Sequence, residues 1–288
     1  MRSRQWGWAV LSGTVLMTAA AAGLKLWADE RRADQSLEAR VKAIRPVPTG
    51  SASCDAWLAG RMPLVLVAMG QSNAGNHGDP PASTAPRPPI PVLHQGRCVM
   101  VQDPLPGATG SGASLWSSVH QQLGGQWAGR PVVWMVMAVE STSLQDWIED
   151  GSPLRQAWER EIDATVATGW PIAGVLWQQG EADALSGTST EDYMRGMRRL
   201  RALTEARGLP GPWWLARSTY CPRADERLRQ DVRAAVADLV DEPGNGFRAG
   251  PDTDSLTGAM RNGCHFSAEG VKAAAVLWRQ ALAMKPPQ

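Results

Sequence analysis

The segment Leu64-Val65-Leu66-Val67-Ala68-Met69, followed directly by Gly70-Gln71-Ser72-Asn73, decides the fold. No polar residue interrupts its apolar run, which is typical of a parallel strand buried on both faces of a sheet. Three later segments have the same character: residues 132–139, 172–177 and 213–216. These segments are the strand candidates for the centre of one sheet.

Segments with apolar residues at helical spacing lie between and after these strands. Two of them are residues 153–168, capped by Ser152, and a final stretch from about 268 to 284, capped by Ser267. The other two are residues 191–206 and 224–240. Alternation of strands and helices predicts one parallel sheet with helices on both faces. Residues 73–91 are rich in Gly and Pro and indicate a long surface loop.

The composition narrows the class of protein. The 288 residues are 43% hydrophobic and 20% charged, so a sizeable core is expected and wholesale disorder is excluded. The net charge is only +1, whereas a nucleic-acid-binding protein carries a strong excess of basic residues. No nucleic-acid partner is therefore expected. Most of the 14 Trp residues are predicted to lie in the core rather than to stack on sugar rings.

The N-terminus has the pattern of a targeting segment. Arg2 and Arg4 precede an apolar run over residues 6–24, and charged residues follow. This pattern predicts a cleaved signal peptide or an uncleaved inner-membrane anchor, with a buried helix as the alternative. The positive-inside rule retains the arginines in the cytoplasm and exports the remainder, so we expect a periplasmic or otherwise extracytoplasmic protein.

Three parts of the chain are expected. Residues 1–28 are the signal peptide or membrane anchor, and the membrane is a partner only through them. Residues 29–50 are charged and then carry Pro and Ser, and are predicted to be a linker. Residues 51–288 form one α/β domain. The oligomeric state is not predicted.

Four cysteines in an exported chain permit two disulfides in three connectivities. We expect Cys54–Cys98 and Cys221–Cys264, because each would pin a loop near a chemically interesting segment. There is no Cys-x-x-Cys and the four histidines are scattered, so no metal site is expected.

Polar residues follow each predicted strand at its carboxyl end, where ligands bind in open α/β sheets. They lie in residues 70–73, 140–144 and 178–183, and a fourth polar segment, 262–267, precedes the last helix. Within them, Ser72 is the candidate nucleophile and His265 the candidate base. A capping serine and a structural histidine are the alternatives.

Two residues of the segment 178–183 could assist catalysis at the end of the strand that precedes it. Gln179 is a neutral amide that could donate a hydrogen bond to an oxyanion. Glu181 could orient that amide, or could simply hold the loop in place.

Three motifs together resemble the SGNH hydrolase superfamily, and most closely its sialate O-acetylesterase-like branch, carbohydrate esterase family 6. They are Gly70-Gln71-Ser72-Asn73, Trp177-x-Gln179-Gly180-Glu181-x-Asp183 and His265-Phe266-Ser267-x-x-Gly270. The resemblance covers about residues 54–284. It implies a three-layer α/β/α sandwich with a central parallel sheet of flavodoxin-like type. It also implies ester hydrolysis without a metal or other cofactor, usually on acetylated sugars.

The resemblance also implies roles for particular residues. Ser72 would be the nucleophile and His265 the base. An oxyanion hole would be formed by the N–H groups of Ser72 and Ser141 and by the Gln179 side chain. Asn73, Glu181 and Asp183 would hold these groups in position without contacting the substrate.

The chain departs from the family pattern at two places. Asn262 stands where the family has an acid three residues before the histidine, and Glu140-Ser141 stands where it often has two glycines. The Asn262 carbonyl could hold the imidazole as the third member of the catalytic group. Alternatively, a Ser–His dyad could suffice, or Asp252, Asp254 or Asp183 could supply the charge.

The sequence thus predicts an exported serine esterase that removes O-acyl groups, most simply O-acetyl groups, from a saccharide or polysaccharide. An acetyltransferase would use the same residues. A degenerate domain that binds a polysaccharide without hydrolysing it is the rival from another class, and a thioesterase or lipase of the same superfamily is a further alternative.

Overall fold

The computed structural model describes residues 36–81 and 87–283. The predicted signal peptide or anchor lies outside the described residues. Of the described residues, those from Leu37 onward belong to one compact unit. No helix among the described residues has the length and apolar character needed to span a membrane.

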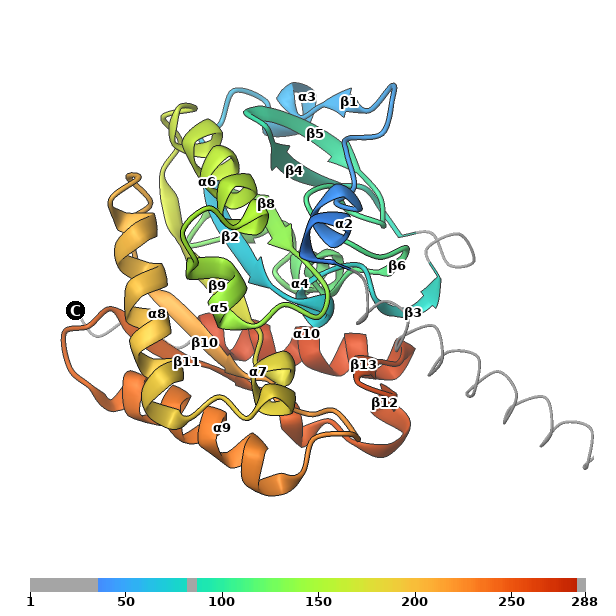
Figure 1. Ribbon diagram of the computed structural model, residues 1–288. Coiled ribbons are helices and arrows are strands. Elements are labelled where there is room, and N and C mark those ends of the chain that lie inside the picture. The colour runs from blue at the N-terminus through green and yellow to red at the C-terminus, as the bar shows by residue number, and fades with distance from the viewer. Residues whose placement is uncertain (1–35, 82–86, 284–288) are drawn as a thin grey trace, which may run out of the picture. The chain divides into compact units, whose positions relative to one another are not determined.

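Nine strands of the described residues form one sheet (Figure 1). In spatial order they are β1 (Ala52–Ser53), β5 (Arg97–Val101), β4 (Ile90–His94), β8 (Arg130–Ala138), β2 (Leu64–Gly70), β9 (Ile172–Gln178), β10 (Trp213–Arg217) and β11 (Phe247–Asp252), with β7 (Gln126–Trp127) paired to β8. The four predicted strands are confirmed as β2, β8, β9 and β10, and β2 pairs in parallel with both β8 and β9. The central strand therefore ends between two neighbours that end at the same edge.

The sheet is mostly parallel rather than wholly parallel, which corrects the expectation. β4 and β5 pair antiparallel, and β1 pairs antiparallel with β5. Gln95 and Gly96 join β4 to β5 with φ values of 50° and 73°. Two residues with positive φ make the tight turn that joins antiparallel strands. The sequence analysis missed β4 because Pro91 lies within it and prolines precede it.

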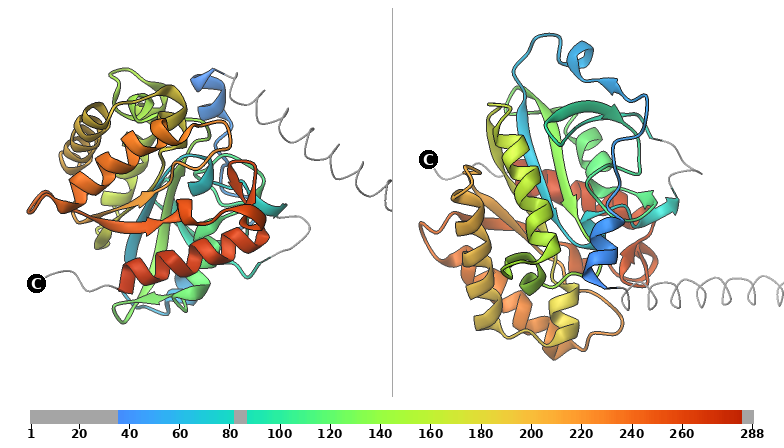
Figure 2. Two further views of the ribbon diagram at one scale, coloured as in Figure 1. Left: turned by 90° about the horizontal axis from the view of Figure 1, so that it is seen from below. Right: turned by 45° about the horizontal axis from the view of Figure 1, so that its top comes forward.

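Helices cover both faces of the sheet (Figure 1, Figure 2). One face carries α5 (Leu144–Ile148), α6 (Pro153–Val166), α8 (Thr190–Glu205) and α9 (Glu226–Asp241), and the other carries α4 (Leu115–Gln122) and α10 (Ala268–Ala283). Alternate residues of β2 enter the two cores: Val65, Val67 and Met69 enter one, and Leu66 and Ala68 the other. The apolar run of β2 is thus explained by burial on both faces.

The four predicted helices are confirmed as α6, α8, α9 and α10, with ends within about two residues of the expected ones. The prediction that most Trp residues lie in the core is also confirmed, because Trp214 and seven others are buried. The seven others are Trp116, Trp134, Trp147, Trp158, Trp177, Trp213 and Trp278.

The domain begins earlier than the sequence indicated. Residues 37–42, expected to be linker, form α2 (Leu37–Lys42), which packs against α6. Leu37, Val41 and Ile44 contact the core, so this short helix has an apolar face to bury. The linker prediction is therefore wrong for this helix.

The described parts of the predicted surface loop 73–91 also contain regular structure, which the sequence analysis did not expect. Residues 72–74 form the turn η1 (Ser72–Ala74), and β3 (Gly78–Pro81) pairs with β6 (Gly112–Ala113). Asn76 is fully buried and its side chain bonds to both the N–H and the carbonyl of Leu105. Such side-chain ties replace the hydrogen bonds of regular structure in a segment rich in Gly and Pro.

Several short elements complete the fold. They are α3 (Asp55–Leu58), α7 (Glu181–Ser186), η2 (Thr253–Ser255), η3 (Gly258–Met260) and the pair β12 (Arg261–Asn262) and β13 (His265–Phe266). The expected disulfides are confirmed, because Cys54 is bonded to Cys98 and Cys221 to Cys264.

Gly70 is required where β2 ends. Its φ is +147°, and a Cβ added there would lie 2.1 Å from the backbone oxygen of Gln178 on β9. Only a residue without a side chain lets the two backbones approach this closely. Gly70 thereby sets the direction in which the chain enters the Ser72 turn.

We expect Gly70→Ala to lower the free energy of unfolding by more than about 3 kcal/mol, since backbone atoms cannot yield as a side chain would. Gly60→Ala is the control, because Gly60 has a φ of +76° but no atom near its Cβ position. It should cost only about 1–2 kcal/mol. Equal losses in urea unfolding would contradict the close-approach argument.

Candidate active site

Ser72 lies at the carboxyl end of the central strand, in the turn η1. Its exposed fraction is 5%. The preceding residue fixes the turn, because the Gln71 Oε1 accepts a hydrogen bond of 3.1 Å from the N–H of Ala182 on α7. The serine is therefore held between the ends of β2 and β9, where the sequence analysis expected it.

Asn73 joins the Ser72 turn to the His265 segment. Its Nδ2 donates to the carbonyl of Cys264 at 3.0 Å and to Glu181 Oε1 at 2.6 Å. The elements η1 and β13 contact each other, and the Cys221–Cys264 disulfide fixes the residue next to His265. The structure thus brings the segments of the predicted nucleophile and base to one edge of the sheet.

His77 lies beside His265, which the sequence analysis did not foresee. The ring centroids are 5.1 Å apart. His77 Nε2 is 3.2 Å from Thr109 Oγ1 and 3.7 Å from Glu140 Oε2. The Glu140 carboxylate therefore forms an ion pair when His77 is protonated. No local pattern around His77 could have indicated this cluster, because its members come from separate loops.

The loop after β8 carries the expected oxyanion donor. Ser141 has a φ of +54°, a conformation that glycine adopts more readily. Arg40 on α2 donates to the carbonyls of Glu140, at 2.9 Å, and of Ser141. The Glu140 carbonyl and the Ser141 N–H share one trans peptide unit and point in opposite directions. By holding the carbonyl, Arg40 directs the N–H away from itself.

The N–H of Ser141 and that of Ser72 have no hydrogen-bond acceptor within the described part of the chain. The Glu140 N–H differs, because it donates to Thr109 Oγ1 at 3.0 Å. Two backbone donors at this edge of the sheet thus have no acceptor among the described residues. Arg40 was missed because it lies in the segment assigned to a linker.

Gln179 does not have the free amide that its expected role requires. Its side chain is fully buried, and Nε2 donates to the carbonyl of Thr142 at 3.0 Å and to Asp183 Oδ2. Its Oε1 accepts from the Tyr193 hydroxyl at 3.0 Å. Both amide hydrogens are used, so the structure contradicts Gln179 as an oxyanion donor. It instead ties the loop after β8 to α7 and α8.

Asp183 supports the same loop. Its Oδ2 also accepts from the N–H of Leu144 at 2.8 Å, and burial raises the pKa of this carboxyl. Glu181 supports the Ser72 turn by accepting hydrogen bonds from Asn73 and, at 2.8 Å, from Ser218. Burial raises the pKa of Glu181 to about 7. The motif Gln179-Gly180-Glu181-x-Asp183 therefore acts through other residues.

Asn262 stands opposite His265 in the β12–β13 pair. Its Nδ2 donates to Asp79 Oδ2 on β3 at 2.8 Å. The three aspartates considered as substitutes for the missing acid are bonded elsewhere. Asp252 pairs with Arg233, Asp254 accepts from the N–H of Thr219, and Asp183 accepts from Gln179.

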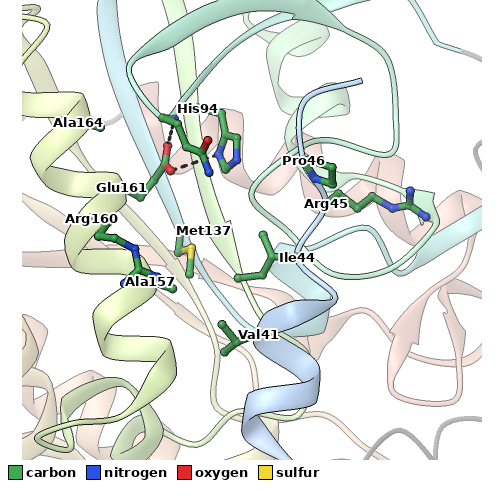
Figure 3. A pocket seen from close by; sticks show the side chains of 11 residues that line it. Val41, Ile44, Arg45, Pro46, His94, Met137, Ala157, Arg160, Glu161 and Ala164 are labelled. Atoms are coloured by element: carbon green, nitrogen blue, oxygen red, sulfur yellow. Dashed lines mark hydrogen bonds and ion pairs between the residues drawn. The ribbon is translucent and has the colours of Figure 1, made fainter. Parts of the chain in front are cut away.

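A pocket away from these residues lies between α2, β4 and α6 (Figure 3). It has a volume of about 440 Å³, and His94 and Glu161 lie 3.3 Å apart at its wall. Neither Ser72 nor His265 lines it. Among the described residues, no group of His, Cys, Asp and Glu side chains is arranged to hold a metal ion.

A family model described as carbohydrate esterase, sialic acid-specific acetylesterase, matches residues 64–208. The chain belongs to this family. It is therefore a carboxylic ester hydrolase of the carbohydrate esterase type, which confirms the resemblance seen in the motifs. The matched residues include Ser72, Ser141 and Gln179 and end before His265.

Solved structures show the same fold. A protein from Arabidopsis thaliana is 20% identical, with a TM-score of 0.59, and the match covers 77% of this chain and 98% of that one. NanS is 15% identical, with a TM-score of 0.51, over 77% of this chain and 97% of that one. A carbohydrate acetylesterase from Xanthomonas citri is 14% identical, with a TM-score of 0.52, over 75% and 55%. No curated protein matches the chain.

We expect Arg40→Met to lower kcat for an acetyl ester about tenfold and to change KM less than about twofold, because a misdirected Ser141 N–H affects mainly the transition state. Adding Ser141→Gly should recover part of the loss, since glycine adopts the positive φ without strain. Lys42→Met on the same helix is the exposed control. An unchanged kcat in the folded Arg40 variant would contradict this role.

A second prediction concerns stability. The folded-state pKa of Glu181 is about 7, against an ordinary 4.5, so the unfolded chain loses this proton first as the pH rises. The protonated Glu181 carboxyl therefore stabilises the folded state below pH 4.5, and this stabilisation is lost as the pH rises from 4.5 to 7. Relative to Glu181→Gln, the native protein should lose about 2–3 kcal/mol between pH 5 and 8. Urea unfolding measures it, and exposed Glu191→Gln should parallel the native protein.

Proposed function

We propose that this protein is an exported serine esterase that removes O-acetyl groups from a saccharide through Ser72 and His265. The hydrogen bond from Asn73 to Cys264 carries the proposal, because it joins the neighbour of the serine to the neighbour of the histidine. Family membership supports an acetylated carbohydrate as the substrate. The name of the Xanthomonas citri neighbour, a carbohydrate acetylesterase, agrees with that class.

In this mechanism His265 accepts the Ser72 hydroxyl proton as Oγ attacks the acyl carbon. The N–H groups of Ser72 and Ser141 stabilise the oxyanion. His265 then returns the proton to the sugar oxygen as the ester bond breaks. Water activated by the same imidazole attacks the acyl-enzyme, releases acetate and regenerates Ser72.

The Glu140 carboxylate does not prevent this chemistry. Its Oε2 lies 3.7 Å from His77 Nε2, and the histidine can offset its charge. When His77 is protonated, it reduces the repulsion that Glu140, the direct neighbour of Ser141, exerts on the oxyanion.

The place of action follows from the disulfides and the N-terminal sequence. Two disulfides fit an oxidising, extracytoplasmic compartment. The apolar run at residues 6–24 would export the chain, and retention of this run as an inner-membrane anchor remains a prediction.

A binding domain without esterase activity is the second candidate. It is favoured by the occupied Gln179 amide and by Asn262 at the position of the family acid. Such a domain would bind an acetylated glycan, yet a fluorophosphonate would not label it.

The full chain should hydrolyse a chromogenic acetyl ester, and Ser72→Ala should lower kcat at least about 10³-fold, because the nucleophile is lost. A fluorophosphonate should label the native protein at Ser72 and not the variant. Exposed Ser186→Ala is the matched control and should retain full turnover. Equal turnover by Ser72→Ala would rule out the nucleophile, and glycan binding without labelling would favour the binding domain.

A further inference from the structure

A carboxylate lies beside the hairpin that carries His265, although the position of the family acid is occupied by an amide. The hairpin is formed by β12 and β13, with Asn262 directly opposite His265. Residues opposite each other on paired strands project to the same face. The hydrogen bond of 2.8 Å from Asn262 to Asp79 therefore places a carboxylate on the His265 side of the hairpin.

The close packing of β3 against α10 explains why Asp79 lies beside the hairpin of β12 and β13. A Cβ at Gly78 would lie 2.5 Å from Val271 Cγ2 on α10, so β3 lies tightly against this helix. His77 and Asp79 flank Gly78, and residues two apart in extended chain project to the same side. The His77 ring faces His265 at 5.1 Å, and Asp79 reaches the partner of His265.

We propose that Asp79 is the acidic positioning residue for His265, acting with Asn262 in place of the acid that the family has at position 262. This inference rests on the proposed function. The two side chains together provide a carboxylate and a hydrogen-bonding amide. The negative charge lies on Asp79 of β3 instead of on residue 262 of β12. A neighbouring negative charge stabilises the imidazolium that forms when Ser72 gives up its proton.

Other charged groups near His265 are the same in every variant described below. His77 contacts its ring, and Glu140 lies next to His77. On β12, Arg261 donates to the carbonyl of Cys264 at 3.0 Å. Glu181 accepts a hydrogen bond from Asn73 and attracts the Arg261 guanidinium electrostatically.

Exchange of the two side chains tests the proposal. Asp79→Asn keeps an oxygen that can accept from Asn262 but removes the charge. Asp79→Asn with Asn262→Asp restores the charge at the family position and keeps a carboxylate–amide pair. Exposed Asp241→Asn is the control for loss of one negative charge. Turnover of an acetyl ester and the pH dependence of fluorophosphonate labelling are measured for the full chain.

Asp79→Asn should lower kcat at least about tenfold with KM changed less than about twofold, and should shift the labelling midpoint to lower pH, because the imidazole becomes less basic. The double variant should recover kcat to within about threefold of the native value and should restore the midpoint. A purely structural role would leave the midpoint of a folded variant unchanged.

The proposal is overturned if folded Asp79→Asn retains native kcat and midpoint, or if the folded double variant stays as impaired as the single one. The double variant decides the question even when Asp79→Asn does not fold, since activity near the native level supports the exchange and a folded, inactive protein refutes it. Failure of the native protein to label or turn over would instead refute the proposed function.

Discussion

The two hydrogen bonds donated by the Asn73 amide are the constraint on which the candidate site depends. One reaches the carbonyl of Cys264 and the other reaches the buried Glu181 carboxylate. They join the end of β2, the start of α7 and the hairpin of His265, which come from distant parts of the chain. A buried carboxylate without such donors would be costly, so the three segments stabilise one another.

The motif after β9 shows how family residues can act indirectly. Gln179, Glu181 and Asp183 are all buried, and their hydrogen bonds go to other protein groups. They hold the Ser72 turn and the loop of Ser141 in place, and backbone N–H groups at these two places remain for the substrate. The rigidity of the site is thus built from side chains that need not touch the reacting atoms.

Outside the family motifs, two residues complete this arrangement. Arg40 on α2 holds the loop whose Ser141 has a positive φ, and Asp79 on β3 bonds to the amide at the position of the family acid. Both compensate for departures from the family pattern, one for a missing glycine and the other for a missing carboxylate. Each lies in a segment that the sequence analysis described as a linker or a surface loop.

The sequence by itself determined the central strands, the four long helices and the family, because each depends on local periodicity or on a short motif. It allowed three disulfide pairings, and the tertiary structure decided for the expected one. The sequence predicted that the segments of Ser72 and His265 meet at one edge, because ligands bind beyond the carboxyl ends of the strands in open α/β sheets. Only the tertiary structure decided that Gln179 is occupied, that His77 lies beside His265 and that Arg40 and Asp79 reach the site. The reason is physical: these contacts join residues far apart in the chain, and no local pattern records which hydrogen-bonding groups meet when the layers pack.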